Sequence, residues 1–254
     1  MTKAISPIFI SHAVPTVLSS ATGLAEVLSS FGAIAAPAAV VVANSHWKTD
    51  RPRVGIFDAG SMAELDLANN IDRLLKSSGF ESAVEVMSRS AFDSHHSLWA
   101  PLSMMFGNRL PPIVTMSVQP SLGTVHHLRL GAALQPLTGR TLVVGSGSLT
   151  HNMVDVHPEL VPGRYIRWAR EFTDWVTQRV EAGDVNALLE YRKRAPHATH
   201  SHPQEDHLLP MFGRLVQARN CAAKCCMTVS PSELSRSQIS HSIEGNSSED
   251  RRDL

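Results

Sequence analysis

The chain has 254 residues, of which 43% are hydrophobic and only 18% are charged, and its formal net charge is zero. This composition is typical of a soluble enzyme and excludes general disorder. The balanced charge gives no indication of binding to nucleic acid or to an anionic membrane. No apolar run approaches the roughly 20 residues of a membrane-spanning helix, and the N-terminus lacks the long apolar segment of a signal peptide. We therefore expect a cytoplasmic protein.

Short, β-branched apolar runs alternate with amphipathic stretches along the chain. This alternation predicts an α/β fold with a central, mostly parallel sheet and helices on both faces. In such a sheet the active site lies at the carboxyl ends of the strands. The predicted strands cover residues 7–11, 38–44, 53–58, 83–87, 112–118 and 141–147, and the predicted helices cover residues 19–31, 61–78, 121–137, 165–182 and 185–194.

The last part of the chain has a different composition. Residues 1–229 are expected to form a single catalytic domain, whereas residues 230–254 are rich in serine and charge and are expected to be a disordered or aberrant tail. The three cysteines, Cys221, Cys225 and Cys226, fall just before this boundary. Their C-x3-C-C spacing fits no common zinc site, so we interpret them as reduced thiols.

Histidines follow several of the predicted strands. His12, His46 and His151 stand at or just beyond the ends of three of them, and His207 and His96 lie in histidine-rich segments further along the chain. A single histidine in such a place is more often a hydrogen-bonded loop residue. Because the carboxyl ends of parallel strands meet at one edge of the sheet, however, these imidazoles are expected to converge. Neutral imidazole is the commonest protein ligand of metals, and the pattern therefore predicts a metal site.

Other polar features of the sequence carry weaker signals. His126 and His127 fall in the middle of a predicted helix and are expected to be partly exposed, and His202 is expected to shape the loop before the helix that we predict near residue 204. The glycine- and serine-rich stretch 145–148 is neither a complete phosphate-binding loop nor a nucleophile elbow.

Five blocks of sequence, taken in order, resemble a known family. They are "PIFISHAVP", "ANSHW", "HSLWAPLSMMF" with "LPPIVTMSV", "GSGSLTHNM" and "HPQEDHLLPM", which together span residues 7 to 211. They resemble the signatures of the class III extradiol ring-cleavage dioxygenases, and within that class they are most similar to the DOPA 4,5-dioxygenase-like branch. The resemblance implies one mononuclear metal, Fe(II) or Zn(II), and insertion of O2 into a small catecholic substrate to give a muconic semialdehyde.

The resemblance also implies a role for each matched histidine. His12, His46 and His207 match metal-binding histidines, and His151 matches a fourth histidine of the metal site that is described as metal-proximal or as an acid/base. His96 matches the histidine that faces substrate and oxygen. The resemblance leaves open whether the protein is a monomer or a homodimer.

Two alternatives remain open at this point. The first is a zinc hydrolase that uses a metal-bound water, for which Glu205 is the only obvious general base. The second is a catalytically decayed, metal-binding homologue. Departures from the family pattern motivate it: Ala13-Val14 replaces a usual Gly-Ser, the stretch "FDAGSMAELD" lacks an aromatic, glycine-rich loop, and the sequence after residue 219 departs from the usual apolar terminus.

Overall fold

A computed structural model describes residues 5–11, 22–58, 60–88, 90–91, 96–137, 139–155, 166–218 and 228–229. His12, the Ala13-Val14-Pro15 motif, the three cysteines and the tail at 230–254 lie outside these residues. The described strands form a seven-stranded sheet in the order β4-β3-β5-β2-β6-β1-β7. The strands are β1 (Ile8–Ser11), β2 (Ala39–Lys48), β3 (Arg53–Phe57), β4 (Ala83–Met87), β5 (Ile113–Val118), β6 (Thr141–Gly147) and β7 (Thr228–Val229).

The sheet is mostly parallel, as predicted, with one exception. β3 pairs in parallel with β4 but runs antiparallel to β5. β3 follows β2 after a short connection that contains no helix, so the chain reverses direction instead of crossing over. The carboxyl ends of β1, β2, β5 and β6 therefore share one edge of the sheet, and those of β3 and β4 lie at the opposite edge.

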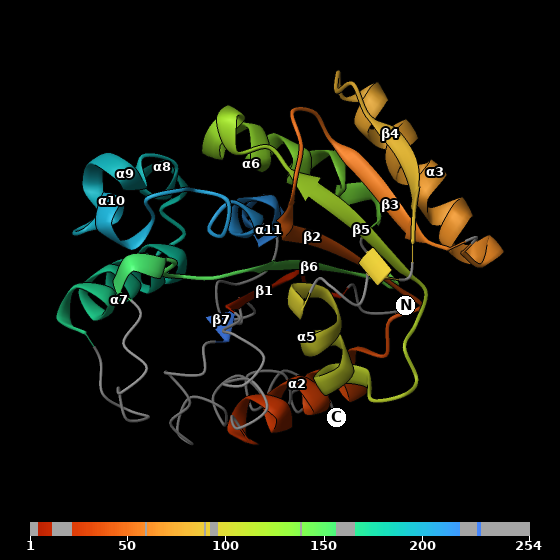
Figure 1. Ribbon diagram of the computed structural model, residues 1–254, viewed down its shortest axis with the longest axis horizontal. Helices are drawn as coiled ribbons and strands as arrows, with labels where there is room; N and C mark the ends of the chain where they lie inside the picture. The colour runs from red at the N-terminus through yellow and green to blue at the C-terminus, as the bar shows by residue number, and fades with distance from the viewer. Residues whose placement is uncertain are drawn as a thin grey trace, which may run out of the picture.

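Helices cover both faces of the sheet, which gives three layers (Figure 1). Helices α2 (Thr22–Ala35) and α5 (His96–Phe106) pack together on one face, and α3 (Met62–Ser77) and α6 (Gly123–Ala133) cover the other. Successive side chains of a strand point to opposite faces, so Val40 and Val42 pack toward α2 and α5, whereas Val41 packs toward α3 and α6.

The remaining helices form a third cluster around the buried Phe9 of β1 and Phe172. They are α7 (Arg167–Glu181), α8 (Val185–Leu189), α9 (Tyr191–Arg194), α10 (Ala198–Ser201) and α11 (Pro210–Ala218). The predicted helix at 185–194 is thus two short helices, the first of which begins where expected, with the Asp184 side chain accepting a hydrogen bond from the Ala187 N–H at 3.0 Å. None of the helices in the described part of the chain is both long and apolar enough to cross a membrane.

Two expectations about the second half of the chain were wrong. The helix predicted near residue 204 begins at Pro210 instead, because proline disfavours helical geometry in the residue before it and suits the first helical position itself. His127, expected to be partly exposed, is buried in α6. Its Nδ1–H donates to the Gly123 carbonyl at 2.7 Å, and its Nε2 accepts from the Gln119 N–H at 3.1 Å, so both nitrogens serve the junction between β5 and α6.

Candidate active site

His46 lies at the carboxyl edge of the sheet, on an irregular end of β2. The strand continues to Lys48, beyond the predicted end at residue 44, and its pairing with β5 shifts register between Asn44 and Lys48. Asn44 explains the polar tip of this apolar strand. Its Oδ1 accepts hydrogen bonds from the His46 N–H at 3.0 Å and from the Ser97 hydroxyl of α5 at 2.7 Å. The buried amide therefore fixes the backbone that carries His46 against the first turn of α5.

Four of the five predicted site histidines come together at this edge. His46 is on β2, His96 opens α5, His151 follows β6 and His207 precedes α11. The ring centroid of His46 lies 4.5 Å from that of His96 and 5.0 Å from that of His207, and both ring pairs meet edge to face. His207 also stacks on His151, with centroids 3.5 Å apart and planes 6° from parallel. We call these four residues the histidine cluster.

Backbone hydrogen bonds join the two loops that carry His151 and His207. The Ser148 N–H donates to the His207 carbonyl, and the His151 N–H donates to the Ser201 carbonyl, both at 2.8 Å. The His207 carbonyl also lies so close to Gly147 at the end of β6 that a Cβ atom on Gly147 would overlap it. These contacts fix the separation of the two stacked rings.

A buried carboxylate orients His207. Oδ1 of Asp206 accepts from the His207 N–H at 3.0 Å and from its Nδ1–H at 3.1 Å, and Oδ2 receives Lys48 Nζ at 2.8 Å. Burial alone raises the pKa of Asp206, but the hydrogen bonds from His207 and Lys48 outweigh it and hold that pKa below its usual range. Because an ionised carboxylate only accepts, the proton of a neutral His207 lies on Nδ1, and the lone pair of the ring is on Nε2, which faces His46.

The nearby imidazoles are kept neutral by their surroundings. Burial, then the neighbouring His207 and Lys48, lower the pKa of His151 to about 4, although Asp206 opposes the shift. Burial likewise lowers the pKa of His202 to about 4, although its hydrogen bond to Leu149 opposes this. His202 is fully buried and its Nε2–H donates to the Leu149 carbonyl at 2.7 Å. It therefore supports the loop before His151, a different loop from the one before the helix near residue 204 that the sequence led us to expect it to shape.

The donor set of the histidine cluster fits a metal ion. Nε2 of His207 lies 3.4 Å from Nε2 of His46. Two imidazole nitrogens bound to one tetrahedral metal at about 2.0–2.1 Å each would lie about 3.4 Å apart. Candidate ligand atoms of His151, Asp206 and His207 also lie within 4.8 Å of one another. Of these we favour the imidazoles, because both oxygens of Asp206 are already engaged by Lys48 and His207.

Glu205 is directed to a different group of residues. Its carboxylate accepts from the Tyr191 hydroxyl at 2.8 Å and pairs with Arg192 at 3.7 Å. The glutamate on which the hydrolase alternative depended is therefore held by α9. Neither Asp206 nor Lys48 was given a role on the basis of the sequence. The spacing of Lys48, two residues after His46 on a strand, is the signal that could have placed both side chains on one face.

Comparison with known proteins agrees with the fold and with the motifs. Residues 13–216 match the family described as the catalytic LigB subunit of aromatic ring-opening dioxygenase. The chain is 32% identical over 195 residues to the "4,5-DOPA dioxygenase extradiol" of Beta vulgaris, covering 69% of this chain and 71% of that protein. It is 34% identical over 196 residues to the enzyme of the same name from Portulaca grandiflora, covering 69% and 70%.

The fold also has a counterpart among solved structures. The crystal structure of an uncharacterised protein from Escherichia coli K12 superposes with a TM-score of 0.61 at 21% identity, covering 75% of this chain and 81% of the other. At this identity the match supports the α/β architecture alone. The family match spans most of the chain and therefore supports the family as well as the fold. This chain belongs to the aromatic ring-opening dioxygenases, as a class III extradiol dioxygenase of the DOPA-dioxygenase-like branch.

Proposed function

We propose that this protein is a metal-dependent extradiol dioxygenase that opens a catecholic ring beside its two hydroxyls and gives a muconic semialdehyde. The observation that carries the proposal is the convergence of four imidazoles, from four separate segments, at the carboxyl edge of the sheet. The names of the relatives support a catechol as substrate, since the plant proteins are named for an action on DOPA. O2 is the second substrate.

His46 and His207 would hold the metal through Nε2, together with His12, which lies outside the described residues. When bound, the metal supplies a Lewis acid for the catechol oxygens and, if it is Fe(II), the electrons needed to activate O2. Asp206 and Lys48 keep the Nε2 lone pair of His207 directed toward His46. This is the arrangement by which a carboxylate fixes the tautomer of a metal-binding histidine.

The other two histidines would handle substrate and protons. His151 is stacked on His207 and neutral, so its imidazole can accept a proton from a catechol hydroxyl. His96 meets His46 edge to face from the first turn of α5, which is a suitable position for donating a hydrogen bond to bound oxygen or substrate. The placement of each ring beside the two nitrogens proposed to bind the metal supports these roles.

Oxygen uptake tests the proposal directly. The protein would be loaded with Fe(II) without oxygen and then given catechols, including DOPA and protocatechuate. We expect uptake of one O2 for each catechol, with a yellow semialdehyde appearing in step. A parallel zinc-loaded sample, tested with ester and amide substrates without oxygen, addresses the hydrolase alternative. Folded, iron-loaded protein that consumes no oxygen with any catechol would contradict the proposal.

A further inference from the structure

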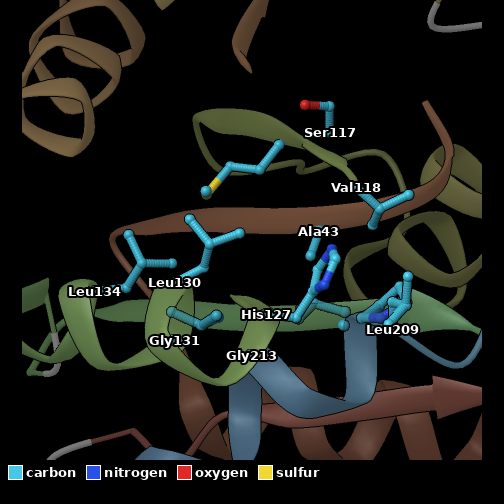
Figure 2. A pocket seen from close by; sticks show the side chains of 14 residues that line it. Ala43, Ser117, Val118, His127, Leu130, Gly131, Leu134, Leu209 and Gly213 are labelled. Atoms are coloured by element: carbon cyan, nitrogen blue, oxygen red, sulfur yellow. The ribbon is translucent and has the colours of Figure 1, made fainter. Parts of the chain in front are cut away.

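A small cavity lies on the face of the sheet opposite α2 and α5 (Figure 2). It has about 30 Å³ of free volume. Its walls come from β2, β5, β6, α6, α11 and the residue before α11, and they include Ala43, Met116, Leu130, Leu134, Val143 and Leu209. Nearly all of these side chains are deeply buried.

The polar side chains in the wall are already hydrogen-bonded. His127 uses Nδ1 on the Gly123 carbonyl and Nε2 on the Gln119 N–H. The Ser117 hydroxyl is engaged by the Thr49 hydroxyl at 2.7 Å, the Arg53 N–H at 2.9 Å and Nε2 of Gln119 at 2.9 Å. A buried water needs two to four polar partners, and apolar cavities that cannot offer them stay dry and accept apolar gases. The lining of this cavity is of the apolar kind, so we expect the cavity to stay dry and to accept an apolar gas.

The helix backbone prevents the cavity from collapsing. Helices α6 and α11 cross at Gly131 and Gly213, where a Cβ atom on Gly131 would overlap the Gly213 carbonyl. A Cβ atom on Gly145 of β6 would likewise overlap the Pro210 carbonyl, so the start of α11 is already in backbone contact with the sheet and cannot move closer to fill the space. The volume is thus a consequence of the helix crossing, and it persists although filling it would improve packing.

The cavity is next to the catalytic edge. Leu209 and Pro210 in its wall follow His207 by two and three residues, and Ser117 and Val118 end the strand adjacent to β2. A molecule in the cavity is therefore separated from the histidine cluster by the short segment that carries His207. Water needs about 10–15 Å³ of such volume, and a diatomic gas needs roughly twice that, so the free volume suits one diatomic molecule.

We propose that this cavity binds molecular oxygen and supplies it to the histidine cluster from the side opposite α5. The proposal rests on the proposed function, which makes O2 a substrate. Molecular oxygen is apolar, so its transfer from water into an apolar pocket is favourable in free energy. A catechol has two hydroxyls, and the side chains of these walls, which are apolar or already hydrogen-bonded, would leave those hydroxyls without partners. The cavity would therefore take the gas and exclude the aromatic substrate.

Xenon tests the binding site without any need for activity. Crystals of the wild-type protein under xenon pressure should show the gas between Leu130 and Val143, and Leu130→Phe, which places a larger ring in the cavity, should abolish that density. Leu75→Phe is the matched control, because Leu75 belongs to the same apolar layer, on α3, but does not line the cavity. Ordered water in the cavity, or xenon density that Leu130→Phe leaves unchanged, would overturn the proposal.

Steady-state kinetics test the supply of oxygen. Leu130→Phe should raise KM for O2 about fourfold, the effect of losing the burial of one methylene-sized apolar group. The kcat at saturating O2 and the KM for the catechol should stay as in the wild type. The control Leu75→Phe should leave the KM for O2, the kcat and the KM for the catechol unchanged. If Leu130→Phe does not fold, Val143→Ala, which enlarges the cavity, should lower KM for O2 instead.

Two results distinguish failure of this proposal from failure of the proposed function. Xenon in the cavity with an unchanged KM for O2 in a folded Leu130→Phe enzyme would overturn the supply role, as would a changed KM for the catechol. A wild-type enzyme that cleaves no catechol contradicts the proposed function, and with it the supply of oxygen, whereas the xenon experiment still decides whether the cavity holds an apolar gas.

Discussion

Asp206→Asn tests whether the buried carboxylate fixes the metal-binding form of His207. The substitution keeps the shape of the side chain but removes its charge and replaces one accepting oxygen with an NH2 group. That group cannot accept from Lys48, and it donates if it rotates toward Nδ1 of His207, which would move the imidazole proton to Nε2. The Nε2 lone pair that faces His46 would then be lost in part of the population.

The size of the effect follows from the exposure of the partners. The side chain of Asp206 is 3% exposed and that of Lys48 is 50% exposed, so water can solvate the freed ammonium group. The ion pair itself is therefore worth no more than about 1 kcal/mol. The bond to His207 matters more, since loss of the carboxylate partner of a metal-binding histidine typically lowers metal affinity about 10–100-fold, which is about 1.4–2.7 kcal/mol.

Metal affinity would be measured by competition with a chromophoric chelator. Asp155→Asn is the matched control, because Asp155 also accepts from a histidine, His200, at 2.6 Å, but lies outside the histidine cluster. We expect weaker metal binding for Asp206→Asn and wild-type binding for Asp155→Asn. A folded Asp206→Asn protein that binds metal as tightly as the wild type would refute the argument that Asp206 sets the tautomer of His207.

Three further outcomes are expected. His46→Ala should abolish metal binding, whereas His151→Phe should keep the metal and lose oxygen uptake; equal metal loss in both would make His151 a ligand. Burial lowers the pKa of His127 from 6.5 to about 4. Between pH 4 and pH 6.5, His127 is therefore protonated in the unfolded chain but neutral in the folded protein. The free energy of unfolding, measured with urea, should fall by about 2 kcal/mol between pH 7 and pH 5 because of His127. In His127→Gln this contribution of about 2 kcal/mol should be missing from the fall. Glu205→Gln should leave oxygen uptake within about twofold of wild type, since removing a partly solvated pair costs about 1 kcal/mol at most; a large fall would mean that Glu205 acts at the metal.

The strands and the meeting point of the histidines were predictable because they depend on local patterns. β-Branched runs bounded by turn residues mark the strands, and parallel strands bring their carboxyl ends to one edge. His46, His96, His151 and His207 accordingly lie together in the structure. Their chemical roles, and the part played by His12, stay predictions for the experiments above.

The features that were missed depend on contacts between distant segments. The burial of His127 requires α11 to pack against α6, and a single helical pattern does not reveal that neighbour. The Lys48–Asp206 pair joins residues 158 positions apart. The reversal of β3 depends on which strand it pairs with, since the pattern of a five-residue strand does not reveal the direction in which it pairs. Pro210, by contrast, was a local signal for the start of α11 that could have been used.

Gly147 has a consequence for how relatives of this protein are recognised. The residue has no side chain and performs no chemistry, yet the His207 carbonyl occupies the space that any Cβ atom at this position would need. A homologue could therefore carry every histidine of the cluster and still have a displaced His207, if evolution had placed alanine or serine at the end of β6. An inventory of imidazoles alone would count such a protein as active. The absence of a methyl group at residue 147 is as much a requirement for assembling the histidine cluster as the presence of the rings.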